Sequence, residues 1–125
     1  LKSFHHTAII CSDYDRSKAF YTSILGLEIL REVYPEDRKS YKLDLALNGM
    51  FILELFSFPS PPARSSRPEA AGLRHLAFGV TNVKKQEELE AKGVTVEDIR
   101  IDAYTGKKFT FFADPDDLPI EIYEL

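Results

Sequence analysis

The feature that most constrains the fold of this chain is an internal repeat. Residues 4–26 align with residues 73–93, and in each an apolar strand pattern is followed by a helical pattern that ends at a glycine. Strand and helix signals that recur in the same order predict two βαβββ modules, an α+β fold. The further strand-like runs after each helix pattern are 27–33, 41–47 and 50–56 in the first half, and 94–101, 108–112 and 119–123 in the second.

Helix start and stop signals agree with this reading. The first helix is expected to begin at Ser12 or Asp13, whose side chains accept hydrogen bonds from free amide groups, and to end at Gly26. The second is expected to begin near Thr81 or Asn82. Each helix pattern has one apolar stripe, which is typical of a helix lying on a sheet.

Turn signals set the module boundaries. The Asn48-Gly49 pair predicts a two-residue hairpin turn, and residues 114–117 are expected to turn the chain at the matching place in the second half. Residues 58–72 are rich in proline and serine and are typical of an extended connector. We therefore expect one domain over residues 1–125, with module 1 at about 4–57, the connector at about 58–72 and module 2 at about 73–125.

Composition narrows the class of protein. The chain has 125 residues, 44% of them hydrophobic, and no apolar run that approaches the 18 residues of a membrane span. Its net charge of -4 argues against a nucleic-acid partner. A single cysteine, Cys11, suits a reducing compartment, so we expect a protein of the cytoplasm with no membrane association.

Two histidines and two glutamates occupy matching places in the repeat. His6 and His75 are 69 residues apart, and Glu54 and Glu121 are 67 apart. Glu54 and Glu121 both lie inside apolar runs, where a charge needs a partner. One imidazole and one carboxylate from each copy predict a four-ligand site for a divalent metal, and nitrogen and oxygen ligands suit Zn²⁺, Ni²⁺ or Co²⁺.

Alternation along the strands decides which histidine faces the site. His6 shares its face with Ala8, whereas His5 falls on the face that meets the helix. In the second copy His75 shares its face with Ala77 and Gly79, whose small side chains leave room beside the imidazole. We expect His5 to be a polar residue at the strand end, or a supporting group for His6.

The sequence resembles the vicinal oxygen chelate superfamily, and within it the small bacterial glyoxalase I-like proteins. Members pair βαβββ modules into a cupped mixed sheet around a metal, and the resemblance places the metal ligands at His6, Glu54, His75 and Glu121. The matching stretches are His6-Thr7-Ala8-Ile9, Ala19-Phe20-Tyr21 with Leu25-Gly26-Leu27, Leu53-Glu54-Leu55, Arg74-His75-Leu76-Ala77-Phe78, and Asp114-Pro115-Asp116 with Pro119-Ile120-Glu121.

The resemblance implies a lyase or isomerase of the glyoxalase I type. The metal would bind two adjacent oxygens of a small substrate, such as the adduct of a 2-oxoaldehyde and a thiol, and stabilise an enediolate while a carboxylate moves a proton. Glu121 is the first choice for that carboxylate and Glu54 the second. Arg100 and Lys108 are candidates for binding an acidic group of the substrate.

Two other functions remain open at this point. An epimerase that acts next to a thioester carbonyl would use the same chemistry. A metal-free binding or resistance module of the same fold would typically lack the four ligands. In every case we expect a homodimer, in which the modules pair within one chain or between two chains.

Overall fold

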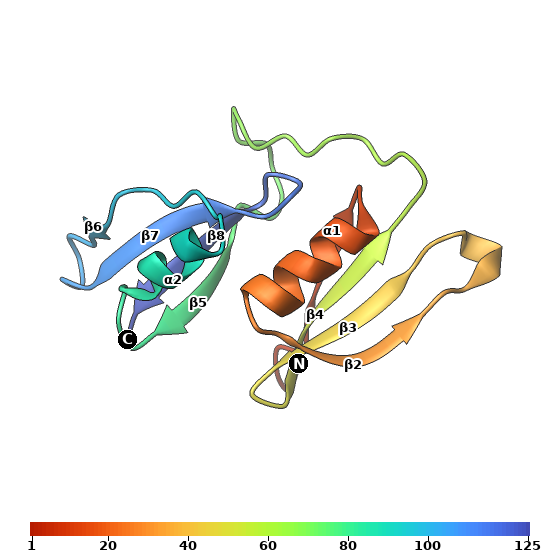
Figure 1. Ribbon diagram of the computed structural model, residues 1–125, viewed down its shortest axis with the longest axis horizontal. Helices are drawn as coiled ribbons and strands as arrows, with labels where there is room; N and C mark the ends of the chain where they lie inside the picture. The colour runs from red at the N-terminus through yellow and green to blue at the C-terminus, as the bar shows by residue number, and fades with distance from the viewer. The chain divides into compact units, whose positions relative to one another are not determined.

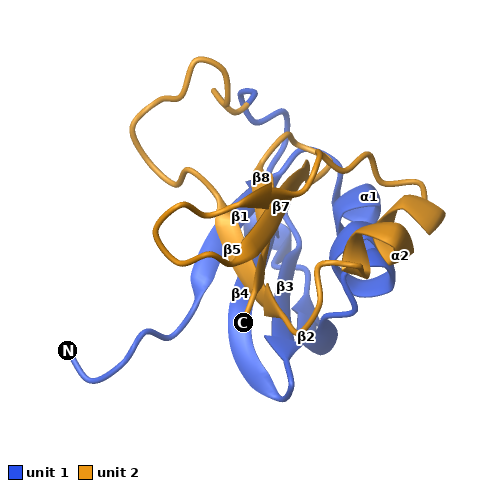
Figure 2. Cartoon of the chain, turned by 90° about the vertical axis from the view of Figure 1, so that its left-hand side faces the viewer, with its two compact units in different colours: residues 1–63 blue, residues 64–125 orange.

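The computed structural model describes residues 1–125, which form two compact units, Leu1–Ala63 and Arg64–Leu125 (Figure 2). Each unit contains one four-stranded sheet and one α-helix, in the order strand, helix and three strands (Figure 1). The α+β fold of two βαβββ modules predicted from the repeat is therefore confirmed. Neither α-helix has the length and apolar character needed to span a bilayer.

Unit 1 is a mixed sheet with the strand order β1-β4-β3-β2. Strand β1 runs parallel to β4, and the other neighbours are antiparallel. Its elements are β1 (Thr7–Cys11), α1 (Tyr14–Ala19), a π-helical turn η1 (Phe20–Ile24), β2 (Glu28–Val33), a 3₁₀ turn η2 (Glu36–Arg38), β3 (Lys42–Leu47) and β4 (Met50–Ser57).

Unit 2 has the same topology, with the order β5-β8-β7-β6 and a parallel β5-β8 pair. The topology of the second sheet thus repeats that of the first, as the sequence repeat requires. Its elements are β5 (Leu76–Val80), α2 (Lys85–Ala91), β6 (Arg100–Ile101), β7 (Lys108–Ala113) and β8 (Pro119–Glu124).

The first helix begins and ends where the sequence signals place it. Asp13 is the N-cap, and its carboxylate accepts from the Arg16 amide at 3.1 Å. Gly26 ends the helical segment with a φ of +79°, a conformation that glycine adopts without strain. The last turns are π-helical rather than α-helical, because the Leu25 amide bonds the Phe20 carbonyl five residues back.

Two elements of unit 2 are shorter than predicted. Helix α2 begins at Lys85, because the Asn82 side chain accepts from the Lys84 amide and caps a turn that precedes the helix. The predicted strand 94–101 pairs regularly only at Arg100–Ile101. The Thr110 hydroxyl donates to the Glu97 carbonyl at 2.6 Å, so a side chain replaces a backbone ladder bond there.

Each sheet has one apolar face and one polar face. Helix α1 lies over the sheet of unit 1 (Figure 1). In β4, Leu53 and Leu55 are fully buried, and by alternation Glu54 points to the opposite face. In β8, Ile120 and Ile122 are buried and Glu121 points the other way. The apolar faces form the cores, so the opposite faces are left to carry the candidate ligands.

Candidate functional site

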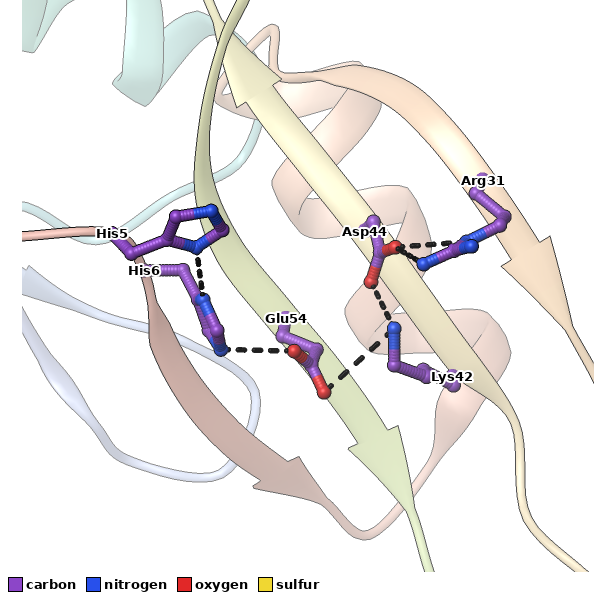
Figure 3. Close-up of polar contacts among 6 residues, drawn as sticks. All are labelled: His5, His6, Arg31, Lys42, Asp44 and Glu54. Carbon is purple, nitrogen blue, oxygen red and sulfur yellow. Dashed lines mark hydrogen bonds and ion pairs between the residues drawn. The ribbon is translucent and has the colours of Figure 1, made fainter.

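The first candidate ligand pair lies on the polar face of unit 1. Ala8 of β1 is the register partner of Glu54 in β4, so His6, two residues before Ala8, lies on the same face of the sheet. The His6 Nε2 atom is 3.0 Å from Glu54 Oε2 (Figure 3). The Glu54 side chain is only 12% exposed, so the imidazole contacts a carboxylate that is largely withdrawn from water.

The second pair repeats this arrangement in unit 2. Ala77 of β5 is the register partner of Glu121 in β8, and His75 precedes Ala77 by two residues. Its Nε2 atom is 3.2 Å from Glu121 Oε2, and the Glu121 side chain is 15% exposed. The structure therefore brings together two of the four predicted ligands in each unit, by the same register and through the same atoms.

The His6 ring is held by two neighbours. It stacks on Phe51 with ring centroids 4.8 Å apart, and its Nδ1 atom lies 2.7 Å from Nδ1 of His5 (Figure 3). One of these two nitrogens donates to the other. When His6 donates, its Nε2 atom keeps a lone pair directed at the site, and His5 acts as the supporting group that the sequence allowed.

Arg74 takes the place of His5 in unit 2. Its Nη1 atom lies 3.4 Å from His75 Nδ1, and the His75 ring packs edge-on against Phe111. The contact is longer than an ordinary hydrogen bond, so it constrains the imidazole weakly. The guanidinium only donates, so this contact favours an unprotonated Nδ1, and binding a metal through Nε2, which places the proton on Nδ1, requires Arg74 to move away.

The small residues beside the two histidines have different neighbours in the two units. A Cβ on Gly79 would come within 2.8 Å of the Leu125 side chain. Glycine at this position therefore accommodates Leu125, in addition to keeping the face beside His75 free of bulk. Ala8 and Ala77 are exposed next to the histidines, as the alternation predicts.

The two glutamates have different neighbours. The Lys42 ammonium is 2.7 Å from Asp44 Oδ1 and 3.8 Å from Glu54 Oε1, and Arg31 bonds the other Asp44 oxygen (Figure 3). Burial of Asp44 acts to raise its pKa, but the hydrogen bonds from Lys42 and Arg31 outweigh it and hold the pKa below its ordinary value. Glu54 is therefore part of a network of charged groups.

Glu121 lies among aromatic rings instead. Its register partner on β7 is Phe111, at the position that Asp44 occupies in unit 1. The network around Glu54 was not predicted from the sequence, although a carboxylate inside the apolar run Leu43-Asp44-Leu45 is a signal that could have revealed it. The two halves are therefore equivalent in their histidines and glutamates but differ in the residues that surround them.

The donor atoms of each pair fit a divalent metal. Two metal ligands with bonds of about 2.1 Å would lie about 3.0 Å apart at a right angle and about 3.4 Å apart at a tetrahedral angle, and the 3.0 and 3.2 Å separations found here also match a direct contact between imidazole and carboxylate. No group of three or more His, Cys, Asp or Glu side chains forms a site by itself.

The two candidate substrate-binding residues lie in different surroundings. The Arg100 guanidinium lies over the rings of Phe109 and Phe111, at 5.1 and 5.4 Å from their centroids, and forms an ion pair with Glu97. It lines a cavity that His75 also lines. Lys108, at the start of β7, is exposed and does not line that cavity.

The chain belongs to the Glyoxalase/Bleomycin resistance protein/Dioxygenase superfamily, whose family profile matches residues 3–122. It is 62% identical to the uncharacterized protein YwkD of Bacillus subtilis (strain 168), over 99% of this chain and 98% of that protein. It is 59% identical to the uncharacterized protein YaeR of Escherichia coli (strain K12), over 99% and 97%. The crystal structure of the glyoxalase family protein from Enterococcus faecalis is 47% identical, with a TM-score of 0.90 and 98% of both chains covered.

More distant relatives include enzymes. A 2-epi-5-epi-valiolone epimerase from Actinomyces sp is 29% identical over 97% of this chain and 78% of that protein. A trypanothione-dependent glyoxalase I of Leishmania major is 26% identical, with a TM-score of 0.74 over 99% of this chain and 87% of that one. The superfamily resemblance found in the sequence is confirmed by these matches, and the activity of this chain is a separate question.

Proposed function

We propose that this protein is a metal-dependent lyase or isomerase of the glyoxalase I type. His6, Glu54, His75 and Glu121 would hold one divalent ion, Zn²⁺, Ni²⁺ or Co²⁺. The observation that carries the proposal is the repeated pair: an imidazole nitrogen and a carboxylate oxygen 3.0 or 3.2 Å apart, at the same register in both units. A binding module without a metal has no need to keep the same two donors in both copies.

The residues of the site have separate roles in this proposal. When bound, the ion supplies Lewis-acid stabilisation of the negative charge that develops on two adjacent substrate oxygens. Glu121 takes a proton from one substrate carbon and returns it to the neighbouring carbon. It is favoured over Glu54 because the Lys42 ammonium lies 3.8 Å from Glu54 and competes with a substrate proton for that carboxylate, whereas Glu121 faces Phe111.

The substrate would be a small molecule with two adjacent oxygens, such as a 2-oxoaldehyde–thiol adduct. The distant similarity to a glyoxalase I supports this substrate class. The distant similarity to an epimerase supports a second candidate, an epimerase that acts next to a thioester carbonyl. Both reactions move a proton at a carbon next to a carbonyl group, so the same site would serve either.

Metal analysis joined to an activity assay tests the proposal. We expect the purified protein to bind about one divalent ion per four-ligand site, and to turn over the methylglyoxal–glutathione adduct after reconstitution with Ni²⁺ or Zn²⁺. Chelation should abolish the activity. A filled site without turnover would contradict the glyoxalase reaction and leave the epimerase, and a protein that binds no metal would contradict both.

We also propose a homodimer in the cytoplasm, where the buried thiol of Cys11 stays reduced. A four-ligand site could then combine the His6–Glu54 pair and the His75–Glu121 pair of one chain or of two chains. A mixing experiment distinguishes the two arrangements. One variant lacks both ligands of unit 1, H6A with E54A, and the other lacks both ligands of unit 2, H75A with E121A. Pairing between chains predicts that a mixed dimer recovers one intact metal site, whereas pairing within a chain predicts none.

A further inference from the structure

A cavity of about 420 Å³ lies within unit 2, next to the candidate ligand His75. Its volume is within the range of small-molecule binding sites. The charged residues that line it are Arg64, Arg67, Arg74 and Arg100, together with Glu69, Glu97 and Asp117. Four guanidinium groups against three carboxylates give the lining an excess of positive charge.

The rim of this cavity is held in place by hydrogen bonds. Arg64 donates from Nε to the Ser66 hydroxyl at 2.7 Å and from Nη2 to the Leu73 carbonyl at 2.6 Å. The buried Ser66 hydroxyl donates in turn to the Asp117 carbonyl in the loop before β8. The segment that carries the arginines is therefore fastened to the body of unit 2, so the cavity is formed before any ligand binds.

Two of the arginines keep donors available for a ligand. Arg67 is exposed and makes no hydrogen bond or ion pair. Arg100 bonds Glu97 through a single nitrogen and is fixed over the rings of Phe109 and Phe111, which leaves its other N–H groups unused. An arginine that is held in one orientation binds a carboxylate or phosphate with little further loss of side-chain freedom.

We propose that this cavity binds an anionic group of the substrate, a carboxylate or a phosphate, through Arg67 and Arg100. The proposal rests on the proposed function, since His75 lines the cavity and also forms the ligand pair with Glu121. It narrows the substrate class to small organic acids or phosphate esters with two adjacent oxygens near the acidic group. Phe111 and Pro119, which also line the cavity, offer apolar surface to the rest of such a substrate.

Titration of the metal-free protein with three probes tests this binding site. Benzoate and phenyl phosphate carry the two candidate anions, and benzamide has the shape of benzoate without its charge. We expect saturable changes in the amide NMR signals of residues 64–74 and 95–100 with at least one anion, and none with benzamide. The tighter of the two anions identifies the acidic group of the substrate class.

Variants assign the binding to the two arginines. R67Q and R100Q should each lower the affinity for the anion by about tenfold, because each removes a charge-assisted hydrogen bond. K84Q is the matched control: it removes an exposed positive charge from the same unit, outside the cavity, and should leave the affinity unchanged. Both arginine side chains are on the surface, so their loss should not unfold the protein.

Three results would overturn the proposal: equal binding of benzamide, no response to either anion, or an affinity that R67Q and R100Q leave intact. A separate titration of the same sample with Zn²⁺ keeps the proposals distinct. If Zn²⁺ binds and neither anion does, the proposed metal site stands and only the anion site is lost. If an anion binds and Zn²⁺ does not, the anion site stands without the proposed reaction.

Discussion

Replacing Glu121 with glutamine is expected to lower turnover by about 100- to 10,000-fold while the protein keeps part of its metal. Glutamine preserves the shape of the side chain and an oxygen donor, but its amide does not accept the proton that a carboxylate accepts at neutral pH. The other three predicted ligands remain in place, so binding of Zn²⁺ should weaken without disappearing. The measurements are kcat with the adduct on which the wild-type protein is active, and metal content by elemental analysis.

The matched variant is Glu54→Gln, which makes the same chemical change in the other unit. The structure separates the two glutamates by their neighbours: Lys42 lies near Glu54, and Phe111 lies beside Glu121. We expect the loss in kcat to be larger for Glu121→Gln than for Glu54→Gln, with similar losses in metal affinity. Full activity of Glu121→Gln would exclude this residue as the base, and a larger loss for Glu54→Gln would exchange the two roles.

Much of this arrangement was predictable from the sequence, because the repeat indicates the order of the elements and alternation indicates which residues share a face of a strand. The choice of His6 over His5 as the partner of Glu54 depends on alternation along the first strand pattern and on the alignment of His6 with His75, and the 3.0 Å contact agrees with it. The matching choice of His75 agrees with its 3.2 Å contact to Glu121. Alternation along a strand was sufficient to predict which side chains face the candidate site wherever one face of the strand is buried and the other is not.

The remaining features depend on contacts between residues far apart in the sequence. The 94–101 segment has a strand-like pattern, yet the Thr110 hydroxyl donates a hydrogen bond to the Glu97 carbonyl. Regular strand pairing in this segment is confined to Arg100–Ile101. The π-helical turn at Phe20–Ile24 gives no sequence signal that differs from an α-helix. The contact between Lys42 and Glu54 depends on the β3-β4 register, which shifts between Leu45 and Ala46, and the Asn48-Gly49 turn signal does not predict this shift.

Replacing Leu55 with alanine is expected to destabilise the metal-free protein by about 2–5 kcal/mol. Leu55 is fully buried on the apolar face of β4, and alanine there would lose the transfer free energy of the deleted carbons and leave a cavity. Urea denaturation measures the effect as a lower midpoint with an unchanged slope. Metal must be absent, because an ion that binds only the folded state would add its own stabilisation.

The neighbouring Glu54 provides the control for this prediction, since it lies on the opposite face of the same strand. Glu54→Gln keeps the volume of the side chain and an oxygen that still accepts hydrogen bonds from its neighbours, so we expect a change in unfolding free energy of only about 1 kcal/mol. Metal binding should respond in the opposite order, with weaker binding for Glu54→Gln and little change for the folded Leu55→Ala variant. Equal destabilisation by the two substitutions would mean that the His6–Glu54 pair is a structural contact rather than half of a metal site. A stable Glu54→Gln protein with weakened metal binding would show that stability and metal binding are carried by opposite faces of one strand.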